Sequence, residues 1–126
     1  MGNKARIIIV DDNCYFREGM KLLIEMEGIG VVIAEAENGK EFLDLLVKLQ
    51  PDLVLMDMEM PMMGGIEATR RALAMRPELK ILAVTMFNDT ANYTGMLDAG
   101  AKGLVIKSAG ITGLKNAIKT TIDLSS

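Results

Sequence analysis

The chain has 126 residues, half of them apolar and a quarter charged, which suits one globular domain and leaves little room for a second. Its formal net charge of −3 supplies none of the basic surface that binding to a nucleic-acid backbone requires. It has no histidine and one cysteine, which excludes histidine metal ligands, histidine general bases and an internal disulfide.

The cysteine and the apolar runs indicate the cellular setting. Cys14 is expected to be a small, partly buried side chain without a chemical role. The longest apolar runs are only as long as a strand, and no charged leader precedes an apolar signal segment. The absence of a disulfide fits a reducing compartment. The sequence therefore predicts a cytoplasmic protein that does not bind a membrane.

Five apolar or β-branched runs alternate with segments of helical length. The runs are Ile7–Val10, Val31–Ala34, Leu53–Met56, Ile81–Val84 and Leu104–Ile106. The first, third and fourth are apolar throughout, as strands buried on both faces are. This alternation predicts a doubly wound α/β fold, in which a five-stranded parallel sheet lies between two layers of helices.

The segments between the strands have apolar side chains at helical spacing. These side chains are Phe16, Met20, Leu23 and Ile24 in the first segment, Phe42, Leu45, Leu46 and Leu49 in the second, and Ile111, Leu114, Ile118 and Ile122 in the fifth. Asn38, with Glu41 three residues later, is expected to cap the second helix. Pro77 is expected to end the third helix, and Gly100 suits a left-handed turn after the fourth.

The fourth helical segment, Asn88–Ala99, has a poor apolar period. Gly95 in its middle costs about 1 kcal/mol relative to alanine. Two interpretations stay open: a surface helix of little consequence, or a helix that is marginally stable so that it can move.

Four of the five strands run directly into polar residues. These are Asp11 and Asp12, Asp57, Thr85 and Lys107. Any one of them could be a cap or turn residue, and Asp12 in particular could cap a helix beginning near Asn13. Ligands of open parallel sheets bind at the carboxyl ends of the strands, and a strand order of 2-1-3-4-5 brings the aspartates onto neighbouring strands. We therefore expect one shared site.

The residue types in this predicted site indicate its chemistry. Two carboxylates about 5 Å apart repel by roughly 3 kcal/mol at an effective dielectric near 20, so three aspartates need a cation. Mg²⁺ suits such a site because it prefers a few carboxylates and accepts a phosphoryl oxygen. Asp57 is then best placed to become an aspartyl phosphate, with Lys107 and the Thr85 hydroxyl on the phosphoryl oxygens.

Together these residues resemble a known family. The matching pieces are Asp11-Asp12, Leu55–Pro61 with Gly64-Gly65, Thr85 and Gly103–Lys107. They resemble the receiver domain of two-component response regulators from about Ala5 to Asp123. The resemblance implies a flavodoxin-like (βα)5 sandwich that is not a dedicated enzyme, and whose Asp57 accepts a phosphoryl group from a sensor histidine kinase. It implies that Asp12 binds Mg²⁺ directly and Asp11 largely through water, with Asp57 and the backbone carbonyl of Glu59 as further ligands.

Further motifs resemble the NarL or LuxR branch of this family. They are Phe16–Met20, Gly65–Arg71, Ala99–Gly103 and Ser108 directly after the lysine. Such receivers usually precede a DNA-binding helix-turn-helix domain. The resemblance thus implies an output domain beyond Ser126 in a longer parent protein, control of transcription, and a homodimer on phosphorylation.

Leu104 departs from the family pattern, because receivers commonly carry an aromatic switch residue at this position. With Thr85 still available, we expect a smaller or differently routed rearrangement, expressed through the weak fourth helix. Two alternatives are kept: an interaction module that works without phosphorylation, and a flavodoxin-like FMN carrier. The FMN carrier is less favoured because Asp11 and Asp12 would repel a phosphate that lacks a metal.

Overall fold

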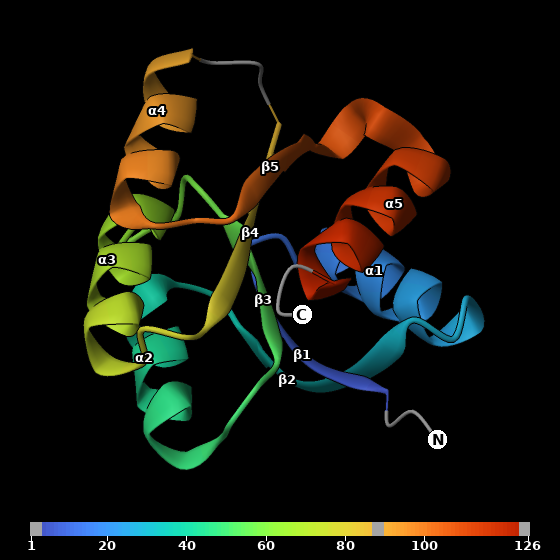
Figure 1. Ribbon diagram of the computed structural model, residues 1–126, viewed down its shortest axis with the longest axis horizontal. Helices are drawn as coiled ribbons and strands as arrows, with labels where there is room; N and C mark the ends of the chain where they lie inside the picture. Colours follow the sequence, from blue (N-terminus) through green and yellow to red (C-terminus); the bar gives the residue numbers. More distant parts are fainter. Residues whose placement is uncertain (1–3, 87–89, 124–126) are drawn as a thin grey trace.

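A computed structural model describes residues 4–86 and 90–123, in which five strands alternate with five α-helices (Figure 1). The strands are β1 (Ala5–Val10), β2 (Gly30–Ala36), β3 (Leu53–Asp57), β4 (Lys80–Thr85) and β5 (Gly103–Ile106). The α-helices are α1 (Cys14–Met26), α2 (Gly39–Lys48), α3 (Gly65–Met75), α4 (Thr90–Ala99) and α5 (Gly110–Asp123), with a short 3₁₀ turn, η1 (Lys107–Ala109), before α5. Within these ranges no helix combines the length and apolar character needed to cross a bilayer.

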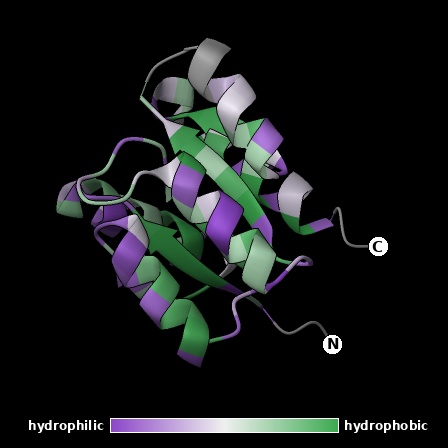
Figure 2. Cartoon of the chain, turned by 90° about the vertical axis from the view of Figure 1, so that its left-hand side faces the viewer, coloured by the Kyte–Doolittle hydropathy of each residue, from purple (hydrophilic) through white to green (hydrophobic). Residues whose placement is uncertain are grey.

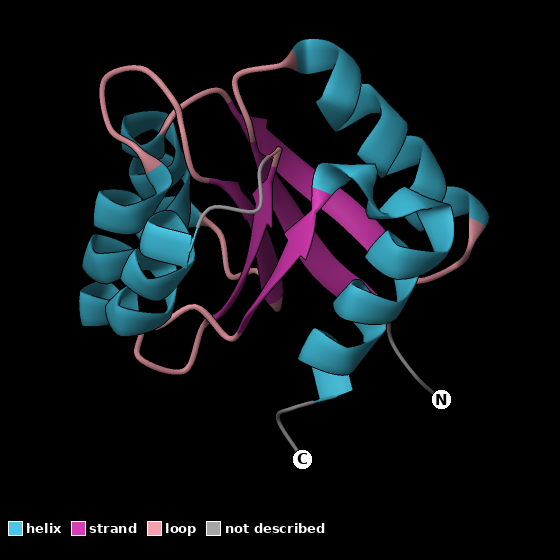
Figure 3. Cartoon of the chain, turned by 90° about the horizontal axis from the view of Figure 1, so that it is seen from above, coloured by secondary structure: helices cyan, strands magenta, loops and turns pink. Residues whose placement is uncertain are grey.

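The strands form one parallel sheet in the order β2-β1-β3-β4-β5, as expected. Helices α2, α3 and α4 cover one face of the sheet, and α1 and α5 cover the other (Figure 3). The predicted flavodoxin-like three-layer fold is confirmed. Because all strands run the same way, the polar residues that follow them lie at one edge of the sheet.

The core has two halves, one on each face of the sheet. Successive strand residues point to opposite faces, so Ile8 and Val10 pack under α2 to α4, whereas Ile7 and Ile9 pack under α1 and α5. Figure 2 shows apolar colouring in the central strands and hydrophilic colouring mainly on the surrounding helices and loops. Burial on both faces explains why these strands read as continuous apolar runs.

Most of the expected helix ends are confirmed. Asn38 Oδ1 accepts a hydrogen bond from the Glu41 backbone N at 2.9 Å and so caps α2. Helix α3 ends at Met75, before Pro77, and Gly100 has a φ of +112° directly after α4.

Helix α1 is capped by Asn13, whose side chain accepts from the first backbone N–H groups of the helix, so the alternative that Asp12 serves only as a cap does not hold. Two expectations about side chains near the helix ends are wrong. Cys14 is exposed rather than partly buried, because it begins α1 on the outward side. Ile111 is 65% exposed although it continues the apolar stripe of α5, because it lies in the first turn, beyond the reach of the sheet. The expected start of the fourth helix at Asn88 lies outside the described residues.

Gly95 has a packing role that its sequence position did not indicate. A Cβ atom at this position would lie 2.8 Å from Cδ1 of Ile66 on α3. The glycine therefore lets α4 approach α3 closely, while Met96 is fully buried beside it. This contact is a third explanation for the glycine, besides the two left open by the sequence.

Candidate functional site

The predicted site residues come together at the carboxyl edge of the sheet. A pocket of about 180 Å³ there is lined by Asp12, Asn13, Asp57, Glu59, Thr85, Met86 and Lys107. Asp11 lies beside it and is 1% exposed, and Asp57 ends the central strand β3 and is 7% exposed. Leu104 is not among these lining residues. It lies on β5 opposite Ala83 of β4 and packs against the core half under α2 to α4.

The three aspartates are close enough to share one cation. Each of Asp11, Asp12 and Asp57 offers a carboxylate oxygen, and these oxygens all lie within 4.8 Å of one another. Apart from an ion pair with Lys107, no hydrogen-bond donor in the described part of the chain satisfies the buried Asp11 Oδ2. A set of clustered carboxylate oxygens with unused acceptor capacity fits a hard divalent cation that retains some of its water.

Lys107 brings a positive charge into this acidic site from the end of β5. Its Nζ lies 2.6 Å from Asp11 Oδ2 and 3.8 Å from Asp57 Oδ1. The lysine side chain is only 10% exposed. Solvent therefore screens these contacts less than it screens a surface ion pair.

The environment of Asp57 disfavours its charged form. Burial raises the pKa of Asp57 to about 6, and the negative charge of Asp11 adds to this rise. The Lys107 charge and a hydrogen bond of 2.9 Å from the Met58 backbone N to Asp57 Oδ1 lower the same pKa. A carboxylate that is costly to ionise at this site is stabilised in its charged form by an incoming cation.

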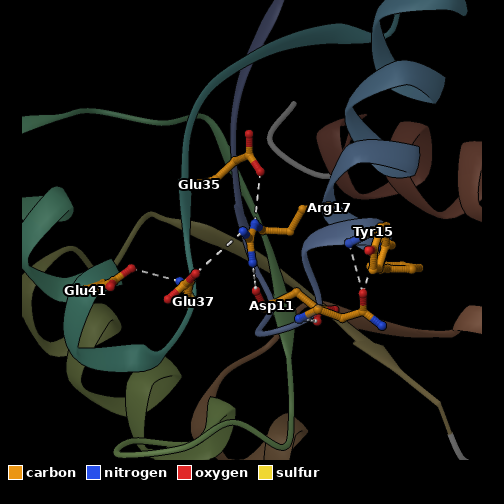
Figure 4. A network of polar contacts seen from close by, with 8 residues as sticks. Asp11, Tyr15, Arg17, Glu35, Glu37 and Glu41 are labelled. Carbon is orange, nitrogen blue, oxygen red and sulfur yellow. Dashed lines mark hydrogen bonds and ion pairs between the residues drawn. The ribbon is translucent and has the colours of Figure 1, made fainter.

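Both the side chain and the backbone carbonyl of Asp11 accept hydrogen bonds that hold the residue in place. The Asn13 backbone N donates to Asp11 Oδ1 at 2.8 Å, and Arg17 Nη1 donates to the Asp11 backbone carbonyl at 2.5 Å. The guanidinium of Arg17 also lies 3.0 Å from Glu35 Oε1 and 3.9 Å from Glu37 Oε1 (Figure 4). This network ties the loop that carries Asp11 to α1 and to the end of β2. The sequence indicated Arg17 only as part of a family motif.

The loop after β3 approaches the expected phosphoacceptor through a glycine. A Cβ atom on Gly65 would lie 2.2 Å from the backbone oxygen of Asp57, and the Gly65 N donates to the Met58 carbonyl at 2.9 Å. Only a residue without a side chain fits this approach without moving the backbone. The Gly64-Gly65 pair was part of the family motif in the sequence, and the structure supplies the geometric reason for Gly65.

A larger hollow, of about 850 Å³, lies at the opposite end of the sheet. Two of its charged groups close helix ends: Arg76 donates to the carbonyls of Leu46 and Leu49, and Lys80 Nζ donates to that of Ile122. These cations are used structurally, so the acidic pocket is the better candidate for chemistry.

The chain matches the response regulator receiver domain family over residues 7–119. It is 38% identical over 117 residues to the transcriptional regulatory protein DegU of Brevibacillus brevis, an alignment that covers 93% of this chain and 50% of DegU. It is 40% identical over 115 residues to the response regulator GacA of Pseudomonas viridiflava, which covers 90% of this chain and 53% of GacA. The chain thus spans about half the length of these curated relatives.

Solved structures that resemble this chain are also response regulators or their receiver domains. A two-component response regulator of the LuxR family from an Aurantimonas species superposes with a TM-score of 0.91 at 38% identity, covering 96% of this chain and 86% of that one. A CheY-like receiver domain protein from Methanospirillum hungatei superposes with a TM-score of 0.88 at 30% identity, covering 97% and 96%. The chain therefore belongs to the response regulator receiver domain family, and LuxR-family regulators are among its relatives.

Proposed function

We propose that this receiver is a phosphoryl-accepting switch whose Asp57 takes its phosphoryl group from the phosphohistidine of a sensor histidine kinase. The observation that carries the proposal is the setting of Asp57: a nearly buried carboxylate at the end of the central strand, with two further aspartates and an ammonium around it. No sensor kinase is needed to test the chemistry, because a small phosphoryl donor serves the same carboxylate.

In the proposed reaction an Asp57 carboxylate oxygen attacks phosphorus as the P–N bond to the kinase histidine breaks. The electron pair of that bond stays on the imidazole nitrogen, and an acyl phosphate forms on Asp57. Lys107 contributes a positive charge near the phosphoryl oxygens, and the Thr85 hydroxyl donates a hydrogen bond to one of them. The only later chemistry at the site is slow hydrolysis of this phosphate, so the domain is a signalling switch and not a dedicated enzyme.

The proposed cofactor is Mg²⁺. Asp11, Asp12, Asp57 and the backbone carbonyl of Glu59 would hold it, with Asp11 acting largely through water. When bound, Mg²⁺ neutralises charge on the transferring group and on the clustered carboxylates. The close spacing of the three carboxylates supports this assignment.

We further propose that phosphorylation is read through Thr85 and α4, without an aromatic switch at Leu104. Leu104 is already packed against the core, so its side chain has less distance to travel than an exposed aromatic would. The parent protein is proposed to be cytoplasmic and to dimerise on phosphorylation. Its DNA contacts are proposed to come from a helix-turn-helix domain beyond Ser126, since the matched relatives are about twice as long and are transcriptional regulators.

The test is incubation with acetyl phosphate and MgCl₂, followed by intact-protein mass spectrometry. We expect one phosphate adduct in the wild type, none in Asp57→Asn and none with EDTA. Asp52→Asn removes an exposed aspartate elsewhere and should keep the adduct. An adduct that persists in Asp57→Asn would show that the acceptor is another residue. A wild type without any adduct would favour an interaction module that works without phosphate, and flavin absorbance would favour the FMN carrier.

A further inference from the structure

Lys107 has a third neighbour that the expected receiver chemistry does not use. Its Nζ lies over the ring of Phe16, 4.3 Å from the ring centroid. This distance is within the range in which the negative face of an aromatic ring attracts a cation. Since the Lys107 side chain is only 10% exposed, the attraction acts on an ammonium that has lost much of its water.

The Phe16 ring is fixed relative to Asp11 by the start of α1. The Asn13 backbone N donates to Asp11 Oδ1 at 2.8 Å, and Asn13 Oδ1 in turn accepts from the Phe16 backbone N at 3.2 Å. Phe16 also packs against the core half under α1 and α5. One short, hydrogen-bonded segment therefore carries both the carboxylate and the ring that contact the lysine.

We propose that Phe16 is a positioning residue for Lys107. Its ring contacts the ammonium alongside the Asp11 and Asp57 carboxylates, and so restricts where the positive charge lies when a phosphoryl group arrives. A lysine side chain is long and its ammonium is strongly hydrated, so it loses orientation unless its surroundings restrict it. The inference rests on the proposed function, because it assigns Phe16 a part in placing the charge that serves Asp57.

The attraction between the Phe16 ring and the Lys107 ammonium can be weakened without greatly changing the shape of the ring. Replacing Phe16 by mono-, di- and trifluorophenylalanine withdraws electron density from the ring face step by step and weakens its attraction for a cation. We expect the rate of phosphorylation by acetyl phosphate to fall in the same order, by about three- to tenfold for the trifluoro ring. The same series at Phe42, a fully buried core residue that does not line the acidic pocket, is the matched control and should leave the rate unchanged.

A second measurement does not depend on phosphorylation. Nuclear magnetic resonance in EDTA should show the Lys107 Hε protons shifted upfield by the Phe16 ring current, and the order parameter of the Lys107 Cε group should fall along the fluorinated series. Phe16→Leu should abolish the upfield shift, whereas Phe16→Tyr should retain it and also retain the rate.

The outcomes separate the two proposals. If the wild type is phosphorylated but the rate is flat or rises along the series, Phe16 does not position Lys107 and the inference is wrong. If the wild type takes no phosphate, the proposed function fails. In that case the Lys107 order parameter still tests whether the Phe16 ring restricts the lysine. Equal order parameters across the fluorinated series would show that it does not, and the inference would be wrong.

Discussion

The Lys107 ammonium is paired more closely with Asp11 than with Asp57, at 2.6 Å from Asp11 Oδ2 against 3.8 Å from Asp57 Oδ1. The lysine thus neutralises a carboxylate that is expected to serve the metal, rather than the expected phosphoacceptor. A divalent cation bound at this site would compete with the ammonium for the negative charge of Asp11, directly or through a bound water. Binding of the cation would therefore release the lysine toward Asp57, where a phosphoryl group arrives.

Lys107→Met is expected to destabilise the protein in EDTA and to strengthen Mg²⁺ binding. Without the ammonium, Asp11 is a buried unpaired charge, which costs about 3 kcal/mol in the free energy of unfolding. Removing the ammonium also removes the group that competes with Mg²⁺ for Asp11. The affinity of the site for Mg²⁺ should therefore rise several-fold, and added MgCl₂ should recover part of the lost stability. Urea unfolding with and without MgCl₂ measures both effects. The matched control is Lys102→Met, an exposed lysine, and an unchanged Mg²⁺ affinity in Lys107→Met would contradict the competition.

Asp57→Asn is expected to stabilise the protein at neutral pH in EDTA. The pKa of Asp57 is raised from 3.8 to about 6 in the folded state, so the folded protein binds more protons than the unfolded chain between these values. The stability contributed by protonated Asp57 is complete below about pH 4 and is lost as pH rises through about 6. At pH 7 the asparagine variant should be about 1–2 kcal/mol more stable, with allowance for solvent screening.

Unfolding experiments from pH 4 to 8 test whether the stability contributed by Asp57 falls as pH rises. The stabilities of wild type and Asp57→Asn should converge at the acidic end and separate as pH rises. The exposed Asp44→Asn serves as the control for a generic change in charge, and its difference from the wild type should stay small across the range. A wild type that gains stability relative to Asp57→Asn with rising pH would contradict the prediction.

Arg17→Met is expected to loosen the acidic site as well as the fold. It removes the hydrogen bond to the Asp11 carbonyl and the ion pair with Glu35, and the arginine side chain is only 11% exposed. We expect a loss of about 1–3 kcal/mol in stability and a several-fold weaker Mg²⁺ affinity, because the Asp11 carbonyl loses the hydrogen bond from Arg17. The control is Arg71→Met, which breaks an exposed pair with Glu67 and should change stability by less than about 0.5 kcal/mol. Calorimetric titration of Mg²⁺ distinguishes a positioning effect from simple destabilisation.

Gly65→Ala and Gly19→Ala are expected to act in opposite directions. A Cβ on Gly65 would lie 2.2 Å from the Asp57 backbone oxygen, so β3 or the following loop must shift, at a cost of about 2 kcal/mol or more. A Cβ on Gly19, in the middle of α1, would meet nothing within 4 Å and should stabilise the helix by about 0.5–1 kcal/mol. Thermal unfolding measures both, and the phosphorylation rate should fall only for Gly65→Ala.

The sheet and the site edge could be predicted from the sequence because both depend on local patterns. Runs such as Ile7–Val10 are apolar throughout, and the polar residues that follow them need only the parallel topology to meet. The contact between Phe16 and Lys107 could not be predicted, since it joins opposite ends of the chain through side-chain packing. The choice of Asn13 over Asp12 as the cap was equally hidden, because the two residues are neighbours in the sequence and both residue types cap helices well.

Helix α4 is expected to exchange its backbone amide hydrogens faster than α1 when the protein is unphosphorylated. It covers the edge of the sheet beside α3, and Tyr93 and Leu97 remain 41% exposed while Met96 is buried. Few buried contacts mean a low free energy of local opening. Beryllofluoride with Mg²⁺ mimics the phosphoryl group and should slow exchange in α4 several-fold, leaving α1 nearly unchanged. Equal exchange in α4 with and without the mimic would mean that this helix does not take part in the switch, and that a signal from Thr85 must leave the domain by another element.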